Sequence, residues 1–436
     1  MFVSVLILLA LGGLMQAARS FANAPGAGTL MSFGFLLLAS FFTGRIADRI
    51  GLPKLTGYLI VGVVAGPHVL ELVSAGSTAS LKLVSDTAVC LIALTAGSEL
   101  NLKRIRPVMP TLRAMTFYAV LLAMVVLAGV LFVIRPFVPF LDKLPIEQAA
   151  AVAAMLGVAL SAQSPAVVMA LIAETRSDGP LSQVILGSVV IADLVVIVVY
   201  AIAATLCASV IGGGTDVVTT AIEVSWEVFG SVVFGFVLGM TLALFLRTVK
   251  RGAVLFTVLI CVVVAEIGAR IRLDPLIVLL ASGIWLENFS RANAHDLLRE
   301  IEAARLPLFL VFFSLAGGRI DIEQLARSIV PIGVVVIARA MAFRMGAAVA
   351  CRRSHAQEVV TRYAWFGLVP QSGLALALAL IIRETFKSSF GDAAAALMFG
   401  VVGTNELLAP IVLRRMLLRS GETGRKNIAD IAVVSH

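Results

Sequence analysis

Apolar runs of about 15–25 residues recur along the whole chain, separated by short loops that hold most of the charge. A run of this length is what an α-helix needs to cross the hydrocarbon layer of a membrane. Only 14% of the 436 residues are charged, whereas soluble domains carry about 25%. The sequence therefore predicts an all-α, polytopic membrane protein with about 13–14 transmembrane helices, and it excludes an ordinary soluble enzyme.

The spanning candidates share this length and a low charge. They lie near residues 2–18, 30–46, 55–70, 85–101, 112–135, 148–172, 180–206, 225–246, 253–269, 275–289, 305–317, 328–350, 362–383 and 392–413. The first is either a spanning helix or a signal peptide cleaved near Ala22-Asn23-Ala24. We expect a spanning helix, because no Lys or Arg precedes the apolar run.

The charged loops predict the orientation of the chain. If the N-terminus is cytoplasmic, the inner loops hold most of the 34 Lys and Arg residues, including Lys103-Arg104 and Lys250-Arg251. This bias follows the positive-inside rule and places both termini in the cytoplasm. Because the basic residues sit in short loops between helices, the net charge of +8 does not indicate nucleic-acid binding.

Cofactor signals are weak throughout. Cys90, Cys207, Cys261 and Cys351 are scattered through apolar segments without ligand spacing, so neither disulfides nor a metal cluster is predicted. No Gly-rich nucleotide fingerprint appears. We expect no enzymatic activity and no cofactor.

Residues 161–193 are the most informative stretch. An apolar segment is interrupted at Gln163-Ser164-Pro165, where Pro165 removes a backbone donor and disfavours helix at the residue before it. The next apolar segment carries one charge, Asp193. Acids inside a membrane are costly and usually functional, although Asp193 could alternatively satisfy a helix–helix hydrogen bond. A broken helix beside a buried acid is typical of a small-cation site.

A second interruption hints at internal symmetry. Pro370-Gln371-Ser372-Gly373 falls in the middle of the thirteenth segment, WFGLVPQSGLALALALII. The two interrupted segments are an odd number apart and so run in opposite directions. Interrupted helices in antiparallel copies are typical of transporters built from inverted repeats.

Four stretches carry a resemblance to a known family. They are GLPKLTGYLIVGVVAGPHVL (51–70), CLIALTAGSELNLKRIR (90–106), ARIRLDPLIVLLASGIWLEN (269–288) and FFSLAGGRIDI (312–322). In this order they resemble the monovalent cation:proton antiporters, especially the second family with the Kef-type potassium efflux transporters. The resemblance runs from about residue 30 to 415, without the family's nucleotide-binding regulatory domain.

The resemblance implies two modules: a dimerisation scaffold and a core transport domain that moves against it like an elevator. It also implies that the two broken helices cross at mid-membrane. The implied divisions are 1–101 and 253–327 for the scaffold, 112–210 and 328–417 for the core, 225–247 for a linker helix, and 418–436 for a short cytoplasmic tail.

The resemblance also assigns the ion site. Asp193 matches the family's essential aspartate, but the preceding position, usually Asp, Asn or Gln, is Ala192. Gln163-Ser164-Pro165 stands where related exchangers have Thr-Asp-Pro. Arg339 matches a family Lys or Arg, and its usual Glu partner falls at about Ser188. These departures bear on the choice of cation and on the stoichiometry.

A lone buried carboxylate can carry either a proton or an alkali cation, because burial disfavours its charged form and either ion neutralises it. Gln163, Ser164, Gln371 and Ser372 are predicted either as oxygen ligands or as caps of the broken helix ends. Arg339 either holds the crossing together as a counter-charge or snorkels to the interface. Its place near the middle of its segment favours the former.

The other deep acid is Glu406, which is a candidate replacement for the missing partner of Arg339. Glu99 and Glu266 lie near helix ends, where we interpret them as structural.

The sequence thus predicts secondary exchange of Na⁺ or K⁺ for H⁺ by a homodimer in a bacterial inner membrane, serving pH homeostasis. With one titrating acid, Asp193, the simplest cycle is electroneutral. One alternative is a gated potassium efflux channel, although no filter-like repeat is present. Another is an organic-anion symporter, which would need a wider polar cavity.

Overall fold

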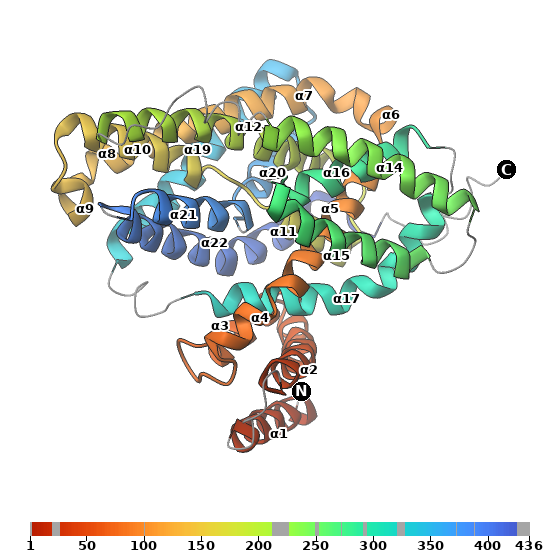
Figure 1. Cartoon of the computed structure of the whole chain (residues 1–436). Helices are drawn as coiled ribbons and strands as arrows, with labels where there is room; N and C mark the ends of the chain where they lie inside the picture. Colours follow the sequence, from red (N-terminus) through yellow and green to blue (C-terminus); the bar gives the residue numbers. More distant parts are fainter. Residues whose placement is uncertain are drawn as a thin grey trace. The chain divides into compact units, whose positions relative to one another are not determined.

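The protein is all-helical, as the sequence predicts, in the part of the chain that the structure describes (Figure 1). The computed structural model describes residues 2–19, 27–99, 101–211, 226–248, 253–271, 273–290, 294–320, 328–371, 373–387 and 389–424.

Seven of the described helical spans are long and apolar enough to cross a membrane, and six further apolar helices have 10–17 residues. Each predicted spanning segment coincides with one of these helices or with α5 (Lys82–Glu99). The chain is a multi-span membrane protein.

The chain divides into two compact units, and both combine distant parts of the sequence. Unit 1 comprises Met1–Glu99 and Val232–Glu323, and unit 2 comprises Leu100–Ser231 and Gln324–His436. The roles of scaffold and transport domain stay predictions.

Unit 1 is built from nine helices or parts of helices that pack against one another in the described chain. They are α1 (Phe2–Arg19), α2 (Ala27–Arg49), α3 (Lys54–Ala65), α4 (Ala75–Ser80), α5, α14 (Ser231–Thr248, apart from its first residue), α15 (Ala253–Ile271), α16 (Pro275–Asn288) and α17 (Ala294–Gly318). The most extensive contacts join α5 to α16 and α3 to both α2 and α17.

Glycines bring these helix pairs together. A Cβ atom on Gly62 of α3 would stand 1.8 Å from the Ser314 carbonyl oxygen of α17, and one on Gly97 of α5 would stand 2.1 Å from the Leu280 oxygen of α16. Small residues at such positions let membrane helices approach backbone to backbone.

Unit 2 opens with short helical pieces. They are α6 (Leu102–Ile105), η1 (Arg106–Val108), α7 (Met109–Ala114), the π-helical turn η2 (Met115–Val120), α8 (Leu121–Val133), η3 (Arg135–Phe137) and α9 (Pro139–Asp142). The remaining elements are α10 (Ile146–Leu160), α11 (Pro165–Thr175), α12 (Pro180–Ile211), η4 (Trp226–Gly230), α19 (Ile329–Ser354), α20 (Glu358–Gly367), α21 (Gly373–Thr385) and α22 (Gly391–Ser420).

The interrupted pair α10 and α11 forms the most buried span of unit 2. Its apolar stretch is completely buried inside the protein. The α10 half packs against α8 and α12, and the α11 half packs against α12 and α22. The second interrupted pair is α20 and α21. The α20 half packs against α12, α19 and α22, while α21 lies along α22 (Figure 1). Both interruptions therefore lie inside unit 2.

Candidate functional site

The first interruption is made by residues 161–164. The helix α10 ends at Leu160, and α11 begins with Pro165 at its first helical position, where the missing N–H costs nothing. Ser164 is extended (φ −129°, ψ 96°), and its Oγ accepts a hydrogen bond from Val167 N at 3.2 Å. Of the two roles predicted for Ser164, the structure places it as a helix cap. Whether it also binds an ion stays a prediction.

The second interruption follows Gly367, the last residue of α20. Leu368, Val369, Pro370 and Gln371 leave the helix, and α21 begins at Gly373. The fourth predicted ligand or cap, Ser372, lies outside the described residues.

Arg339 of α19 joins the two interruptions. The side chain is fully buried. Its Nε donates at 2.8 Å to the oxygen of Leu160, the last residue of α10, and one terminal nitrogen donates at 2.7 Å to the Ala162 oxygen in the first interruption. The guanidinium also donates to the oxygens of Leu368, at 3.3 Å, and Val369 in the second. The two interruptions are therefore adjacent, because one planar guanidinium group donates to carbonyl oxygens at both.

This geometry explains how Arg339 can be buried without a carboxylate where the family places one. Helix C-termini leave carbonyl oxygens without partners and carry a partial negative charge. Four such oxygens receive the guanidinium, and its Cζ lies 4.7 Å from the centre of the Phe343 ring. Ser188, the position of the family's Glu, is buried too. Pairing of Arg339 with Glu406 stays a prediction.

Gln371 makes a second link between the interruptions. Its Nε2 donates to the Leu160 oxygen at 2.7 Å, and its Oε1 accepts from Asn405 Nδ2 of α22 at 2.7 Å. Both ends of the amide are therefore engaged within the protein. Sequence reasoning missed Asn405, although its place beside Glu406 in an apolar segment was a usable signal.

Gln163 differs from Gln371 in this respect. It is 1% exposed, and neither amide atom has a hydrogen-bond partner among the residues that the structure describes. A buried amide without partners is costly, and such groups are few in native proteins. The amide oxygen of Gln163 is thus the part of this interruption best suited to accept a further ligand.

Asp193 lies in α12, which packs against α10, α11 and α20 and so against helices of both interruptions. Its side chain is 4% exposed, and the preceding Ala192 is fully buried. Glu406 of α22 is also buried, at 2% exposure. Unit 2 thus combines these two buried acids with a buried guanidinium and two helix interruptions. Carboxylate, amide and carbonyl oxygens of this kind suit a hard monovalent cation.

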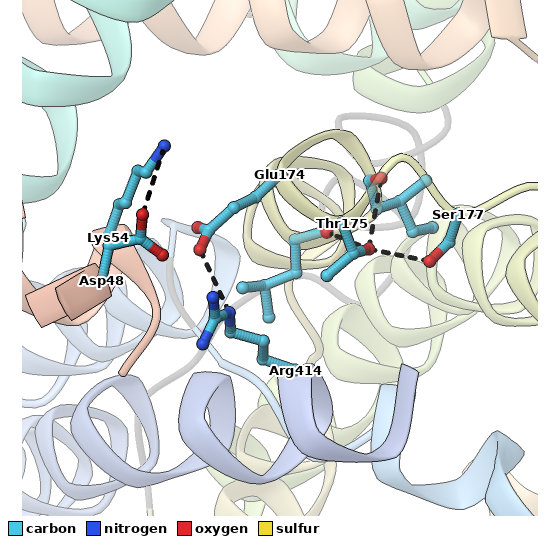
Figure 2. A network of polar contacts seen from close by, with 8 residues as sticks. Asp48, Lys54, Glu174, Thr175, Ser177 and Arg414 are labelled. Atoms are coloured by element: carbon cyan, nitrogen blue, oxygen red, sulfur yellow. Dashed lines mark hydrogen bonds and ion pairs between the residues drawn. The ribbon is translucent and has the colours of Figure 1, made fainter. Parts of the chain in front are cut away.

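The far ends of α11 and α22 are also joined. Figure 2 shows the Glu174 carboxylate pointing toward Arg414, with Arg414 Nε 3.2 Å from Glu174 Oε1, and the Thr175 and Ser177 hydroxyls 2.7 Å apart. The buried Glu422 lies just beyond α22 and accepts hydrogen bonds from α12. Sequence reasoning missed Glu422, because nothing in its local sequence predicts burial.

Two adjacent interrupted helices and a buried acid within a multi-span helical protein define the class of secondary transporters with discontinuous helices. Within that class, the chain belongs to the family described as sodium/hydrogen exchanger, transmembrane, whose profile matches residues 35–419.

Individual relatives are distant. The chain is 24% identical over 337 residues to the high-affinity Na(+)/H(+) antiporter NhaS3 of Synechocystis sp., a match that covers 69% of this chain and 70% of that protein. Two structures of the sodium proton antiporter MjNhaP1 from Methanocaldococcus jannaschii share the fold. The structure at pH 8 has a TM-score of 0.64 at 15% identity and covers 90% of this chain and 99% of its own. The electron-microscopy structure has a TM-score of 0.71 at 14% identity and covers 89% and 97%.

Proposed function

We propose that the protein exchanges a monovalent cation, Na⁺ or K⁺, for protons, and that Asp193 binds the two in turn. The observation that carries this proposal is the burial of Asp193 on α12, the helix that packs against parts of both interrupted helices. Binding either ion neutralises the buried charge, and competition for one carboxylate couples the two fluxes. Membership of the sodium/hydrogen exchanger family and the activities named for NhaS3 and MjNhaP1 support the same reading.

The proposed ion site consists of Asp193 with Gln163, and with carbonyl oxygens of the first interruption that Arg339 does not occupy. Ser164 and Gln371 are engaged in capping and bridging. We assign them to holding the interruptions in place, with Arg339 as the central counter-charge. Nothing in this mechanism calls for a cofactor.

Purified protein in liposomes tests the proposal. Asp193→Asn keeps the shape of the side chain and removes the charge, so cation-driven proton flux is expected to fall to background while the protein stays folded. Asp142→Asn, at an exposed position of the same unit, is the matched control and should exchange normally. Appreciable flux in the Asp193→Asn protein would exclude the assignment. Separate runs with Na⁺, K⁺ and Li⁺ identify the cation, and proton movement that depends on the cation excludes a channel or an organic-anion symporter.

We further propose that the cycle is electroneutral. Ala192 carries no proton, and Arg339 remains charged through any physiological cycle, which leaves Asp193 as the titrating group. Each net charge moved would couple to voltage at about 2.3 kcal/mol per 100 mV. Na⁺-driven proton flux with the potential clamped by potassium and valinomycin should therefore be independent of voltage. A systematic voltage dependence would implicate a second proton carrier, for which the buried Glu406 is the first candidate.

We also propose that unit 2 moves like an elevator and that unit 1 forms a homodimer. The membrane in which the protein lies is proposed to be a bacterial inner membrane. The two-unit architecture and the bacterial relative NhaS3 support them. The comparisons support the sodium/hydrogen exchanger family and do not support assignment to the second, Kef-type family: the similar proteins carry the names NhaS3 and MjNhaP1.

A further inference from the structure

The first turn of α12 lacks a local cap. Helix N-termini leave backbone N–H groups without partners, and these are usually satisfied by a polar side chain at the position before the helix. Here that position is Gly179, and Pro180 has no N–H. The next two donors are the N–H groups of Leu181 and Ser182.

Glu422 supplies the missing cap from 240 residues away. Its Oε1 accepts from Leu181 N at 2.7 Å, and its Oε2 accepts from Ser182 N at 2.9 Å and Ser182 Oγ at 2.7 Å. The side chain is 2% exposed. A carboxylate that accepts three hydrogen bonds at a helix N-terminus is strongly held, because the helix dipole and the charge-assisted bonds act together.

The local backbone makes room for this contact. The helix α22 ends at Ser420, and Gly421 turns the chain with a left-handed backbone (φ 77°) that other residues rarely adopt. On the receiving side, a Cβ atom on Gly179 would lie 2.4 Å from the Glu422 carboxyl carbon. Gly179 thus cannot cap α12 itself, but it leaves the space in which the Glu422 carboxylate does so.

The same short segment also holds α11. Asp178 N donates to the backbone oxygen of Glu422 at 3.1 Å, and Gly424 N donates to the backbone oxygen of Thr175 at 3.2 Å, at the C-terminal end of α11. The segment 420–424 therefore joins the end of α11, the loop that follows it and the start of α12. Of these two helices, α11 begins at the first interruption and α12 carries Asp193.

We propose that Glu422 is a positioning residue, whose buried carboxylate fixes α12 against α11 and so holds Asp193 in register with the first interruption. Asp193 lies about 18 Å along α12 from Leu181, at 1.5 Å per residue, and a helix transmits a shift of its end over that length. Glu422 lies beyond residues 35–419, which match the family, so this anchor belongs to the part of the chain outside the shared profile. The effect on transport rests on the proposed function.

Three variants separate positioning from simple capping. Glu422→Ala removes the cap and with it the side-chain link from the end of α22 to α12, and it keeps the two backbone hydrogen bonds of Asp178 and Gly424. Adding Gly179→Ser to Glu422→Ala restores a local cap without the link, and the space vacated by the carboxylate accepts the new side chain. Ser182→Ala removes one of the three hydrogen bonds. Glu147→Ala, at an exposed first-turn acid of α10, is the matched control.

We expect Glu422→Ala to lower the melting temperature in detergent and to raise the apparent KM for the cation on the order of tenfold, as small misplacements remote from a site can do. In the Glu422→Ala/Gly179→Ser protein the melting temperature should recover and the KM should stay raised. Ser182→Ala should raise the KM by itself and add nothing in the Glu422→Ala background. Glu147→Ala should match the wild type in both measurements.

Recovery of the KM together with the melting temperature in the double variant would overturn the proposal and leave Glu422 as a helix cap. So would a wild-type KM in folded Glu422→Ala protein. Hydrogen exchange gives a readout independent of transport: peptides covering 161–175 should lose protection in the double variant if the anchor sets their register. Wild-type protein without cation-driven flux would defeat the proposed function, whereas unchanged exchange in those peptides would defeat the anchor.

Discussion

In unit 1, neighbouring helices pack backbone against backbone, whereas unit 2 contains several buried charged side chains. In unit 1, Gly62 approaches the Ser314 oxygen, and Gly283 of α16 would place a Cβ atom 2.2 Å from the Leu94 oxygen of α5. Some buried hydroxyls there donate within their own helix: Thr95 Oγ1 donates to the Leu91 oxygen at 2.7 Å, and Ser98 Oγ donates to the Leu94 oxygen at 2.9 Å. Such a unit is held by close packing and internal hydrogen bonds.

The buried charged side chains of the described chain all belong to unit 2, and they are Asp193, Arg339, Glu406 and Glu422. The hydrogen bonds of Arg339 and Glu422 join residues far apart in sequence rather than neighbours on one helix. Since membranes penalise buried charge heavily, a unit that keeps four of them is the one in which function is expected. We therefore expect close packing to stabilise unit 1 and ion binding to take place in unit 2, and mutations can test each expectation.

The largest effect is expected at Arg339. Arg339→Leu leaves the carbonyl oxygens of Ala162, Leu368 and Val369 without their donor, at about 1–3 kcal/mol for each group, while Gln371 Nε2 still donates to the Leu160 oxygen. We expect a loss of about 4 kcal/mol or more in stability in detergent, with little folded protein recovered. Arg339→Lys should restore only part of this, because an ammonium cannot span both interruptions as the guanidinium fork does.

Arg344→Leu is the control for Arg339, since Arg344 is exposed on the same helix. Equal thermal stability of the Arg339→Leu and Arg344→Leu proteins would show that unit 2 does not depend on its polar centre.

The next effect is expected in unit 1. Gly62→Val forces a side chain into the Ser314 backbone, and overpacking of this kind costs about 2–3 kcal/mol. Gly34→Val in α2, where nothing lies within 4 Å of the added Cβ, is the control and should change thermal stability little. If the two variants melt alike, close backbone approach is not what stabilises unit 1.

A smaller effect is expected at Asn405. Asn405→Leu removes the donor to Gln371 Oε1 and leaves that oxygen buried, which costs about 1–2 kcal/mol. Thr404→Val removes only a hydrogen bond within α22, from Thr404 Oγ1 to the Gly400 oxygen, and should be close to neutral in a thermal melt. A larger loss in Thr404→Val than in Asn405→Leu would contradict the bridging role of Gln371.

The smallest effect on stability is expected at Gln163, where stability and cation affinity should respond differently. Because its amide atoms have no partners in the described structure, Gln163→Met should leave thermal stability unchanged or raise it slightly. The same variant should weaken the apparent affinity for the cation if the amide oxygen is a ligand. Gln183→Met, at a half-buried position of α12, controls for the substitution. An unchanged KM in Gln163→Met would return Gln163 to a structural role.

Local sequence properties predict the helices of this protein and their interruptions. Apolar runs of membrane-spanning length fixed the helices, because a backbone in hydrocarbon must satisfy its own hydrogen bonds. Pro165 and Pro370 located both interruptions, since proline removes a donor and restricts its predecessor. Asp193 stood out as a charge within an apolar segment. These are local properties, which one stretch of chain decides alone.

Which polar groups bind one another depends instead on the tertiary fold. Gln163 and Gln371 look alike in sequence, yet one amide is bridged to Leu160 and Asn405 while the other has no described partner. Arg339 donates hydrogen bonds to backbone oxygens up to 179 positions away, and Glu422 caps a helix that begins more than 240 positions before it. Carbonyl oxygens carry no sequence signature, because every residue has one. Their use as partners depends on which helix ends the fold brings together.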